Sequence, residues 1–285
     1  EQAAGRLEVL AERLEGGAAG WGTEPGAADA LRRLDPRGDR IVAYVGKLIV
    51  SKGVDLLLAA WPLVAVRVPD ARLCVVGFGT YRDALHRLAG ALEAGDLAAA
   101  REIARRGREL EGGPAGQLRY LAGFLDGLAG AGDDYLAAAA AAFGRVHFTG
   151  ALDHSDLPYL LPACQVQVVP STFPEAFGMV AVEAAACGAL PLSASHSGLA
   201  EVTRAFAEEV EPEIARLLSF EIGPNAVEEM AHKLVEWLEL PEDDRLRASR
   251  ALSELARERY GWERVAEGVI AAAQGRLAEL PEPPA

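Results

Sequence analysis

Cysteine is scarce in this sequence: its 285 residues include three, Cys74, Cys164 and Cys187. All three lie in apolar or alanine-rich surroundings, so we expect reduced thiols packed as small hydrophobic side chains, as in a cytoplasmic protein, rather than a disulfide framework. No two cysteine or histidine residues stand at the spacing of metal ligands, so we expect no metal site and no metal cofactor. Long uncharged apolar runs and a signal peptide are also lacking, and we therefore expect no membrane span.

Positive charge is the second scarcity. The chain has 42 acidic and 28 basic side chains, which gives a formal net charge of −14. A surface this acidic repels nucleic acid and anionic membranes, so we expect neither as a partner. Apolar residues make up 51% of the chain, which is enough for a proper core, and the length suits one large or two small domains.

Short β-branched or apolar runs alternate with helical patterns along the chain. We expect strands at residues 41–45, 72–76, 145–149, 165–169, 189–193 and 217–222. Strand and helix alternate at least five times, which predicts an α/β fold with a doubly wound parallel sheet of the Rossmann type. Residues 1–38 are too short for a domain and are interpreted as a linker or hinge segment.

The stretch 170–188, PSTFPEAFGMVAVEAAACG, joins one of these strands to a helix that should begin near residues 176–178. Its N-terminus would face the carboxyl end of a parallel strand, where free backbone N–H groups bind phosphate. Glu175 lies in the loop and Glu183 about two turns inside the helix, a separation that suits the two ends of a nucleoside diphosphate. Two solvated acids with no such role are the alternative interpretation.

A second strand-to-helix turn, residues 46–53, carries Lys47 and Lys52 between two glycines. Glycine lets the backbone approach an anion closely, and lysine supplies a compact positive charge for phosphate. Taken alone, the two lysines fit an ordinary solvated loop better than a phosphate site.

The spacing Glu175-x7-Glu183, set in STFPEAFG and EAAACG and followed by SGLAEV at residues 197–202, resembles the donor-binding half of retaining GT-B glycosyltransferases. These are the glycogen-synthase-like and sucrose-synthase-like enzymes of glycosyl transferases group 1. The resemblance implies transfer of a sugar from a nucleotide diphosphate sugar, such as UDP- or GDP-hexose, to an acceptor hydroxyl. It covers residues 40 to about 274 apart from a helical insertion at about 81–143, and we interpret residues 39–280, with this insertion, as the nucleotide-sugar-binding domain. The N-terminal acceptor domain is then a missing partner.

The resemblance also implies roles for the residues of the 170–188 stretch. Glu175 would contact hydroxyls of the donor sugar, and Glu183 would contact the ribose. The backbone of the helix start would face the sugar and the diphosphate; these positions are Phe177, Gly178, Met179 and Val180.

The other implied contacts lie after two earlier strands. Lys47 and Lys52 would hold the diphosphate beside Gly46 and stabilise it as it leaves, which makes the two lysines and Glu175 the catalytic candidates. Lys47 stands where the relatives carry arginine, so the charge is kept but the bidentate fork is lost. The backbone at Leu152 would meet the nucleotide base.

Residues 81–143 depart from the family pattern, because about three helices are expected where relatives have one short helix. This helical insertion has four open interpretations: a lid, an oligomer contact, an acceptor-side addition or a passive bulge. The alternative function is a non-catalytic nucleotide-sugar-binding module that serves as a scaffold. A sugar-nucleotide epimerase is a weaker third reading, since only Glu175 is available as an acid or base near the sugar.

Overall fold

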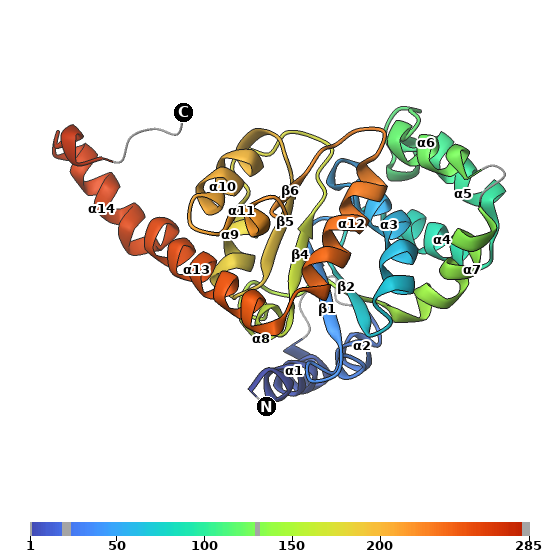
Figure 1. The fold of residues 1–285 in the computed structure, drawn as a ribbon, viewed down its shortest axis with the longest axis horizontal. Coiled ribbons are helices and arrows are strands. Elements are labelled where there is room, and N and C mark those ends of the chain that lie inside the picture. Colours follow the sequence, from blue (N-terminus) through green and yellow to red (C-terminus); the bar gives the residue numbers. More distant parts are fainter. Residues whose placement is uncertain (1, 19–23, 129–131, 281–285) are drawn as a thin grey trace.

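A six-stranded parallel sheet forms the centre of the computed structural model, which describes residues 2–18, 24–128 and 132–280 (Figure 1). Its strand order is β3-β2-β1-β4-β5-β6. The doubly wound, Rossmann-like sheet predicted from the sequence is therefore confirmed. The chain leaves β1 and β4, which are neighbours, toward opposite sides, and ligands bind such sheets at this switch point. The strands are β1 (Arg40–Val45), β2 (Ala71–Val76), β3 (Val146–Gly150), β4 (Val166–Val169), β5 (Leu190–Ala194) and β6 (Ser219–Phe220).

The outermost strand β6 is shorter than the expected strand at 217–222. It pairs on one side only, with Ser219 opposite Ser193 and Phe220 opposite Ala194. Gly223 and Pro224 follow almost at once, and neither residue favours extension of a strand.

Helices cover both faces of the sheet. The α-helices are α1 (Gln2–Arg13), α2 (Ala27–Arg32), α3 (Val54–Arg67), α4 (Arg82–Glu93), α5 (Leu97–Arg106), α6 (Arg119–Gly127), α7 (Asp133–Ala142), α8 (Leu157–Leu160), α9 (Met179–Ala186), α10 (Ser197–Ala207), α11 (Pro212–Ala215), α12 (Ala226–Glu239), α13 (Glu242–Tyr260) and α14 (Trp262–Ala273). Side chains alternate along β1: Val42 and Tyr44 enter the larger apolar cluster with α3 and α12, whereas Ile41 and Ala43 enter a second cluster with α1, α2 and α8.

The N-terminal helices α1 and α2 are part of this packing. Leu10 and Leu31 are fully buried in the second cluster, and Arg13 forms an ion pair with Asp156 at 3.0 Å. The segment interpreted as a linker therefore packs against the sheet. Its role as a hinge to a further domain stays a prediction.

The helical insertion packs against α3 through buried hydrogen bonds. Tyr135 donates its hydroxyl to the carbonyl of Ala59 at 2.8 Å, and the Trp61 indole donates to the carbonyl of Ala142 at 3.2 Å. The last helix expected in the insertion, residues 117–142 with a break at 130–132, corresponds to α6 and α7, and residues 129–131 between them lie outside the described residues.

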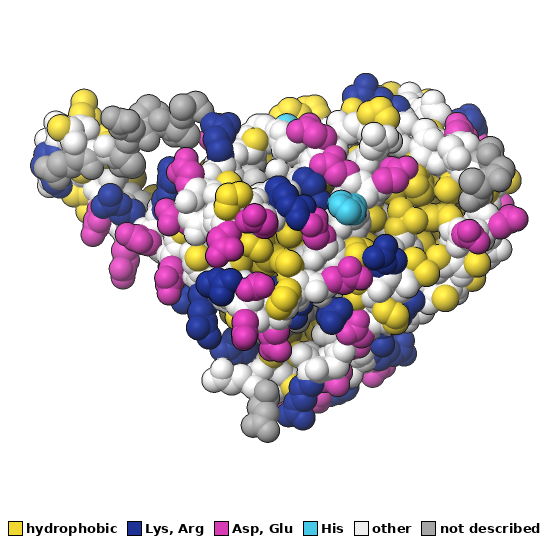
Figure 2. Space-filling view, in the orientation of Figure 1, with side chains coloured by type: hydrophobic (Ala, Val, Ile, Leu, Met, Phe, Trp, Pro, Cys, Tyr) yellow, Lys and Arg dark blue, Asp and Glu magenta, His cyan; other side chains and the backbone are white. Residues whose placement is uncertain are grey.

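The surface mixes charges. Figure 2 shows acidic and basic side chains interspersed over the face in view, with apolar side chains between them. The last helix, α14, extends from the body of the molecule (Figure 1) and exposes Trp262, Val265 and Val269. Among the described helices, none combines the length and the apolar character that crossing a bilayer requires.

Candidate functional site

The loops that follow β1 and β4 pack directly on each other at the carboxyl edge of the sheet. A 3-10 turn, Val50–Lys52, ends at Gly53, which has a left-handed φ of 66°. A Cβ at Gly53 would lie 1.9 Å from the carbonyl oxygen of Pro170, so only glycine permits this approach. The N–H of Thr172 donates to the carbonyl of Ser51 at 2.9 Å. The two loops therefore form one continuous wall of the site.

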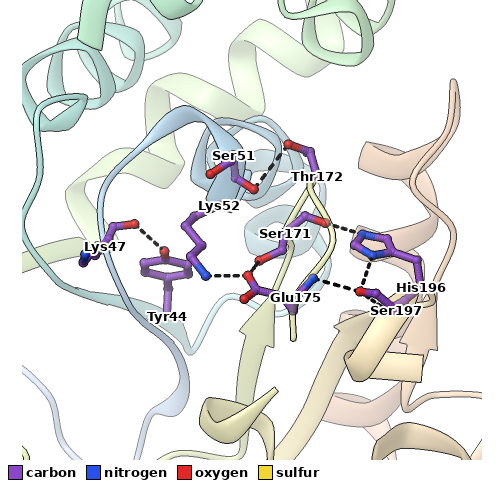
Figure 3. Close-up of polar contacts among 9 residues, drawn as sticks. All are labelled: Tyr44, Lys47, Ser51, Lys52, Ser171, Thr172, Glu175, His196 and Ser197. Carbon is purple, nitrogen blue, oxygen red and sulfur yellow. Dashed lines mark hydrogen bonds and ion pairs between the residues drawn. The ribbon is translucent and has the colours of Figure 1, made fainter. Parts of the chain in front are cut away.

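Lys52 and Glu175 meet across this wall. The Lys52 ammonium and the Glu175 carboxylate form an ion pair, and the Ser171 hydroxyl donates to the same carboxylate oxygen at 2.5 Å (Figure 3). Both charged side chains are partly exposed, 29% for Lys52 and 23% for Glu175. Burial opposes ionisation of Glu175, but the hydrogen bonds from Lys52 and Ser171 and the charges of Lys52 and His196 outweigh it, so the pKa is lowered. The carboxylate is therefore held ionised and ready to accept hydrogen bonds.

A further set of contacts fixes the backbone of Glu175. Its N–H donates to the Ser197 hydroxyl at 2.9 Å, and its carbonyl accepts from the N–H of Gly198 at 3.0 Å. His196 Nε2 lies 2.7 Å from the carbonyl of Ser171, which can only accept, so this nitrogen carries the proton. Sequence reasoning missed these positioning residues. The SGLAEV motif contained the signal, because it begins at Ser197.

The N-terminus of α9 points free backbone donors into the same region. Helix α9 begins after Gly178, which has a φ of 107°. Within the described residues, the N–H groups of Gly178, Met179 and Val180 have no hydrogen-bond acceptor. Such groups, together with the helix dipole, bind anions. The neighbouring Phe177 is exposed, and its ring packs edge-on against Tyr260, with ring centroids 5.5 Å apart.

Glu183 lies on the side of α9 that meets the loop after β3. It is the fifth residue of α9, just over one turn inside the helix rather than about two, because the helix begins at Met179, directly after the expected start at residues 176–178. Burial raises the pKa of Glu183, and the charge of His154, 3.9 Å away, opposes this effect. Leu152 lies two residues before His154 and is half buried. The structure thus brings the predicted ribose and base positions close together.

The end of β1 carries the two remaining predicted residues. Gly46 donates its N–H to the carbonyl of Val76 at 3.0 Å, and the carbonyl of Lys47 accepts from the Tyr44 hydroxyl at 2.8 Å. The Lys47 side chain is exposed and points away from Glu175 (Figure 3). Its predicted contact with a diphosphate stays a prediction. Within the described residues, no group of three or more His, Cys, Asp or Glu side chains is placed to hold a metal ion.

Comparison with known proteins identifies one family. The sequence model of the family described as "Glycosyl transferases group 1" matches residues 31–97 and 128–258. The unmatched gap, residues 98–127, falls inside the helical insertion. One solved structure, "Crystal structure of Anabaena Alr3699/HepE in complex with UDP and glucose", aligns with a TM-score of 0.50 and 21% identity over 87% of this chain and 53% of that chain. This likeness concerns the fold.

Two curated mycobacterial proteins are similar in sequence. The "GDP-mannose-dependent alpha-(1-6)-phosphatidylinositol monomannoside mannosyltransferase" of Mycolicibacterium smegmatis is 39% identical over 70 residues, which cover 24% of this chain and 18% of the relative. The "D-inositol 3-phosphate glycosyltransferase" of Mycobacterium sp. (strain KMS) is 32% identical over 181 residues, 62% of this chain and 29% of the relative. The chain thus spans less than a third of the length of either relative.

Proposed function

Because this chain belongs to the glycosyl transferases group 1 family, we propose that it is the donor-binding domain of a retaining glycosyltransferase. It would bind a nucleotide diphosphate sugar such as UDP- or GDP-hexose, in the cytoplasm and without a metal ion. A second domain of the same enzyme would bind the acceptor molecule and present its hydroxyl. The observation that carries the proposal is the Lys52–Glu175 ion pair, which joins two loops at the switch point of the sheet beside the free N–H groups of α9.

The proposed donor lies across this edge of the sheet. Lys52 and the N-terminus of α9 bind the diphosphate, and Glu175 accepts hydrogen bonds from hydroxyls of the sugar. Glu183 binds the ribose: burial raises its pKa, and ribose hydroxyls supply the donors that a half-buried carboxyl needs. The base then lies against the backbone near Leu152.

The proposed reaction proceeds with retention. As the bond from the anomeric carbon to the diphosphate oxygen breaks, Lys52, Lys47 and the α9 N–H groups stabilise the negative charge on the leaving group. The acceptor oxygen attacks the anomeric carbon on the same face, and its proton leaves with the diphosphate. Glu175 positions the sugar and forms no covalent bond to it.

Calorimetry without Mg²⁺ tests the assignment of the phosphate site. Wild-type protein should bind UDP or GDP, and Lys52→Ala should weaken binding at least about tenfold, as expected when a charged hydrogen-bond partner is lost. Lys233→Ala is the matched control, because Lys233 pairs with Glu229 on α12, outside the site. Unchanged affinity in Lys52→Ala would contradict the proposal.

A second variant tests the ribose contact. Glu183→Ala should weaken binding of UDP and GDP but not of pyrophosphate, which has no ribose. Equal losses for all three would contradict the contact. Turnover by the full-length enzyme separates a transferase from a nucleotide-sugar-binding scaffold.

A further inference from the structure

A cavity of about 250 Å³ lies between the helical insertion and the loop that carries Lys52. One wall comes from Arg108 and residues 116–121, which fall within the part of the insertion that the family model leaves unmatched. The opposite wall comes from Asp55 at the start of α3 and from Thr172 in the loop after β4. The insertion therefore completes a pocket that the rest of the domain leaves open.

The insertion wall is held in place by hydrogen bonds. The Glu111 carboxylate accepts from the N–H of Val50 at 2.8 Å, and Arg108 lies 3.4 Å from the same carboxylate group. The N–H of Leu118 donates to the carbonyl of Ala104 at 2.8 Å. The Glu111–Val50 bond connects the cavity wall to the loop that presents Lys52, and the other contacts hold the wall together within the insertion.

Asp55 is the polar group at the floor of the cavity. The residue is 3% exposed, and its Oδ1 atom is buried without a hydrogen-bond partner within the described structure. Burial raises the pKa of Asp55 to about 7, although the backbone N–H groups of Asp55 and Leu56 favour the ionised carboxyl, so the unmet demand is that of Oδ1. A buried oxygen without a donor is costly, and native proteins rarely keep one unless it has a role. A hydroxyl group entering the cavity would supply the missing donor.

The surroundings of Asp55 select the chemistry of that hydroxyl compound. Two guanidinium groups, Arg108 and Arg119, line the cavity and disfavour a cation, whereas the buried Asp55 carboxyl disfavours an anion. Leu56 and Leu121 add apolar surface, and the half-buried Tyr120 ring lies 4.4 Å from the Arg119 guanidinium. A neutral molecule with hydroxyl groups and apolar C–H faces fits this lining.

The cavity adjoins the donor site through consecutive residues. Thr172 lines the cavity, while the preceding Ser171 donates to Glu175. We propose that the cavity is an acceptor subsite that takes one neutral sugar ring, with a ring hydroxyl donating to Asp55. A volume of about eight water molecules suits one hexose rather than an oligosaccharide. The inference rests on the proposed function, and it favours the acceptor-side interpretation of the insertion.

Saturation-transfer NMR on the 285-residue chain, with UDP present in excess, tests the subsite. Methyl α-glucoside, methyl α-mannoside and methyl α-galactoside are the neutral probes; glucosamine and inorganic phosphate are the charged ones. At least one neutral probe should bind saturably, and Asp55→Leu and Tyr120→Ala should each weaken it at least about fivefold, as expected when a central contact is truncated. Tyr120→Ala keeps the test decisive if Asp55→Leu does not fold.

A control variant locates the binding. Tyr159→Ala removes a tyrosine that also lies beside an arginine, Arg13, but belongs to the other apolar cluster, and it should leave binding of the neutral probe unchanged.

Three results would overturn the subsite. The first is that no neutral probe binds saturably, and the second is that Asp55→Leu and Tyr120→Ala both bind the neutral probe as tightly as the wild-type protein does. The third is that glucosamine or phosphate binds more tightly than the neutral sugars. Each leaves the proposed function intact as long as UDP binds. Failure of UDP to bind would instead contradict the proposed function.

Discussion

Asp55→Asn should change how the stability of the protein depends on pH. The substitution keeps the shape of the side chain but removes its ionisation. In the wild-type protein, burial raises the pKa of Asp55 from 3.8 to about 7. The folded protein therefore binds more protons than the unfolded chain between these two values. The free energy of unfolding must then fall as the pH rises through this window.

The size of this change in the free energy of unfolding follows from the shift in the pKa of Asp55. Each pH unit inside the window costs up to about 1.4 kcal/mol, and the loss levels off above the pKa of the folded state. Because the sequence pI is about 4.9, solubility favours work above pH 5.5. Between pH 5.5 and pH 8, the free energy of unfolding of the wild-type protein should therefore fall by about 2 kcal/mol more than that of the Asp55→Asn variant.

Urea unfolding followed by circular dichroism measures this difference. The comparison uses the change in stability between the two pH values, so any constant cost of burying the amide cancels. Asp29, an exposed acid in the first turn of α2, provides the matched control, and Asp29→Asn should keep the wild-type pH dependence. If the profiles of wild type and Asp55→Asn ran parallel within about 0.5 kcal/mol, the buried, proton-binding carboxyl would be refuted.

Two smaller predictions concern the walls of the donor site. Gly53→Ala should lower the urea midpoint more than Gly95→Ala: both glycines have a positive φ, 66° and 70°, but only at Gly53 would a Cβ collide with Pro170. Equal losses would contradict the close contact of the two loops. Ser171→Ala should raise the pKa of Glu175, because a hydrogen bond that favours the carboxylate is lost. A carboxyl ¹³C NMR titration measures this, and an unchanged value would contradict the role of the serine.

The sequence predicted the sheet, and it placed Lys52 and Glu175 in loops at one edge of that sheet, but it did not predict their ion pair. Both residues follow strands of a parallel sheet, and the carboxyl ends of such strands share one edge. The depth of Glu183 in its helix was wrong by one turn, because the loop continues to Gly178 before the helix begins. Helix boundaries depend on tertiary contacts of this kind, which one sequence does not reveal.

Other features depend on packing that the sequence does not encode locally. The direction of the Lys47 side chain depends on the rotamer that this exposed residue adopts. Asp55 has the pattern of an ordinary acid in the first turn of a helix, where the dipole favours it. Only the insertion and the loop after β4, far away in the sequence, reveal its burial. The position of His196 beside the loop after β4 likewise depends on the strand order, which places β5 next to β4.

The ion pair between Lys52 and Glu175 has a consequence for discrimination under the proposed function. In this structure, the Lys52 ammonium and the Glu175 carboxylate are paired with each other. Inorganic phosphate alone would pair with the Lys52 ammonium and leave the Glu175 carboxylate without a partner. An intact sugar nucleotide would instead offer a new partner to both residues at once. When the sugar has departed, the carboxylate competes again for the ammonium and helps to expel the spent nucleotide.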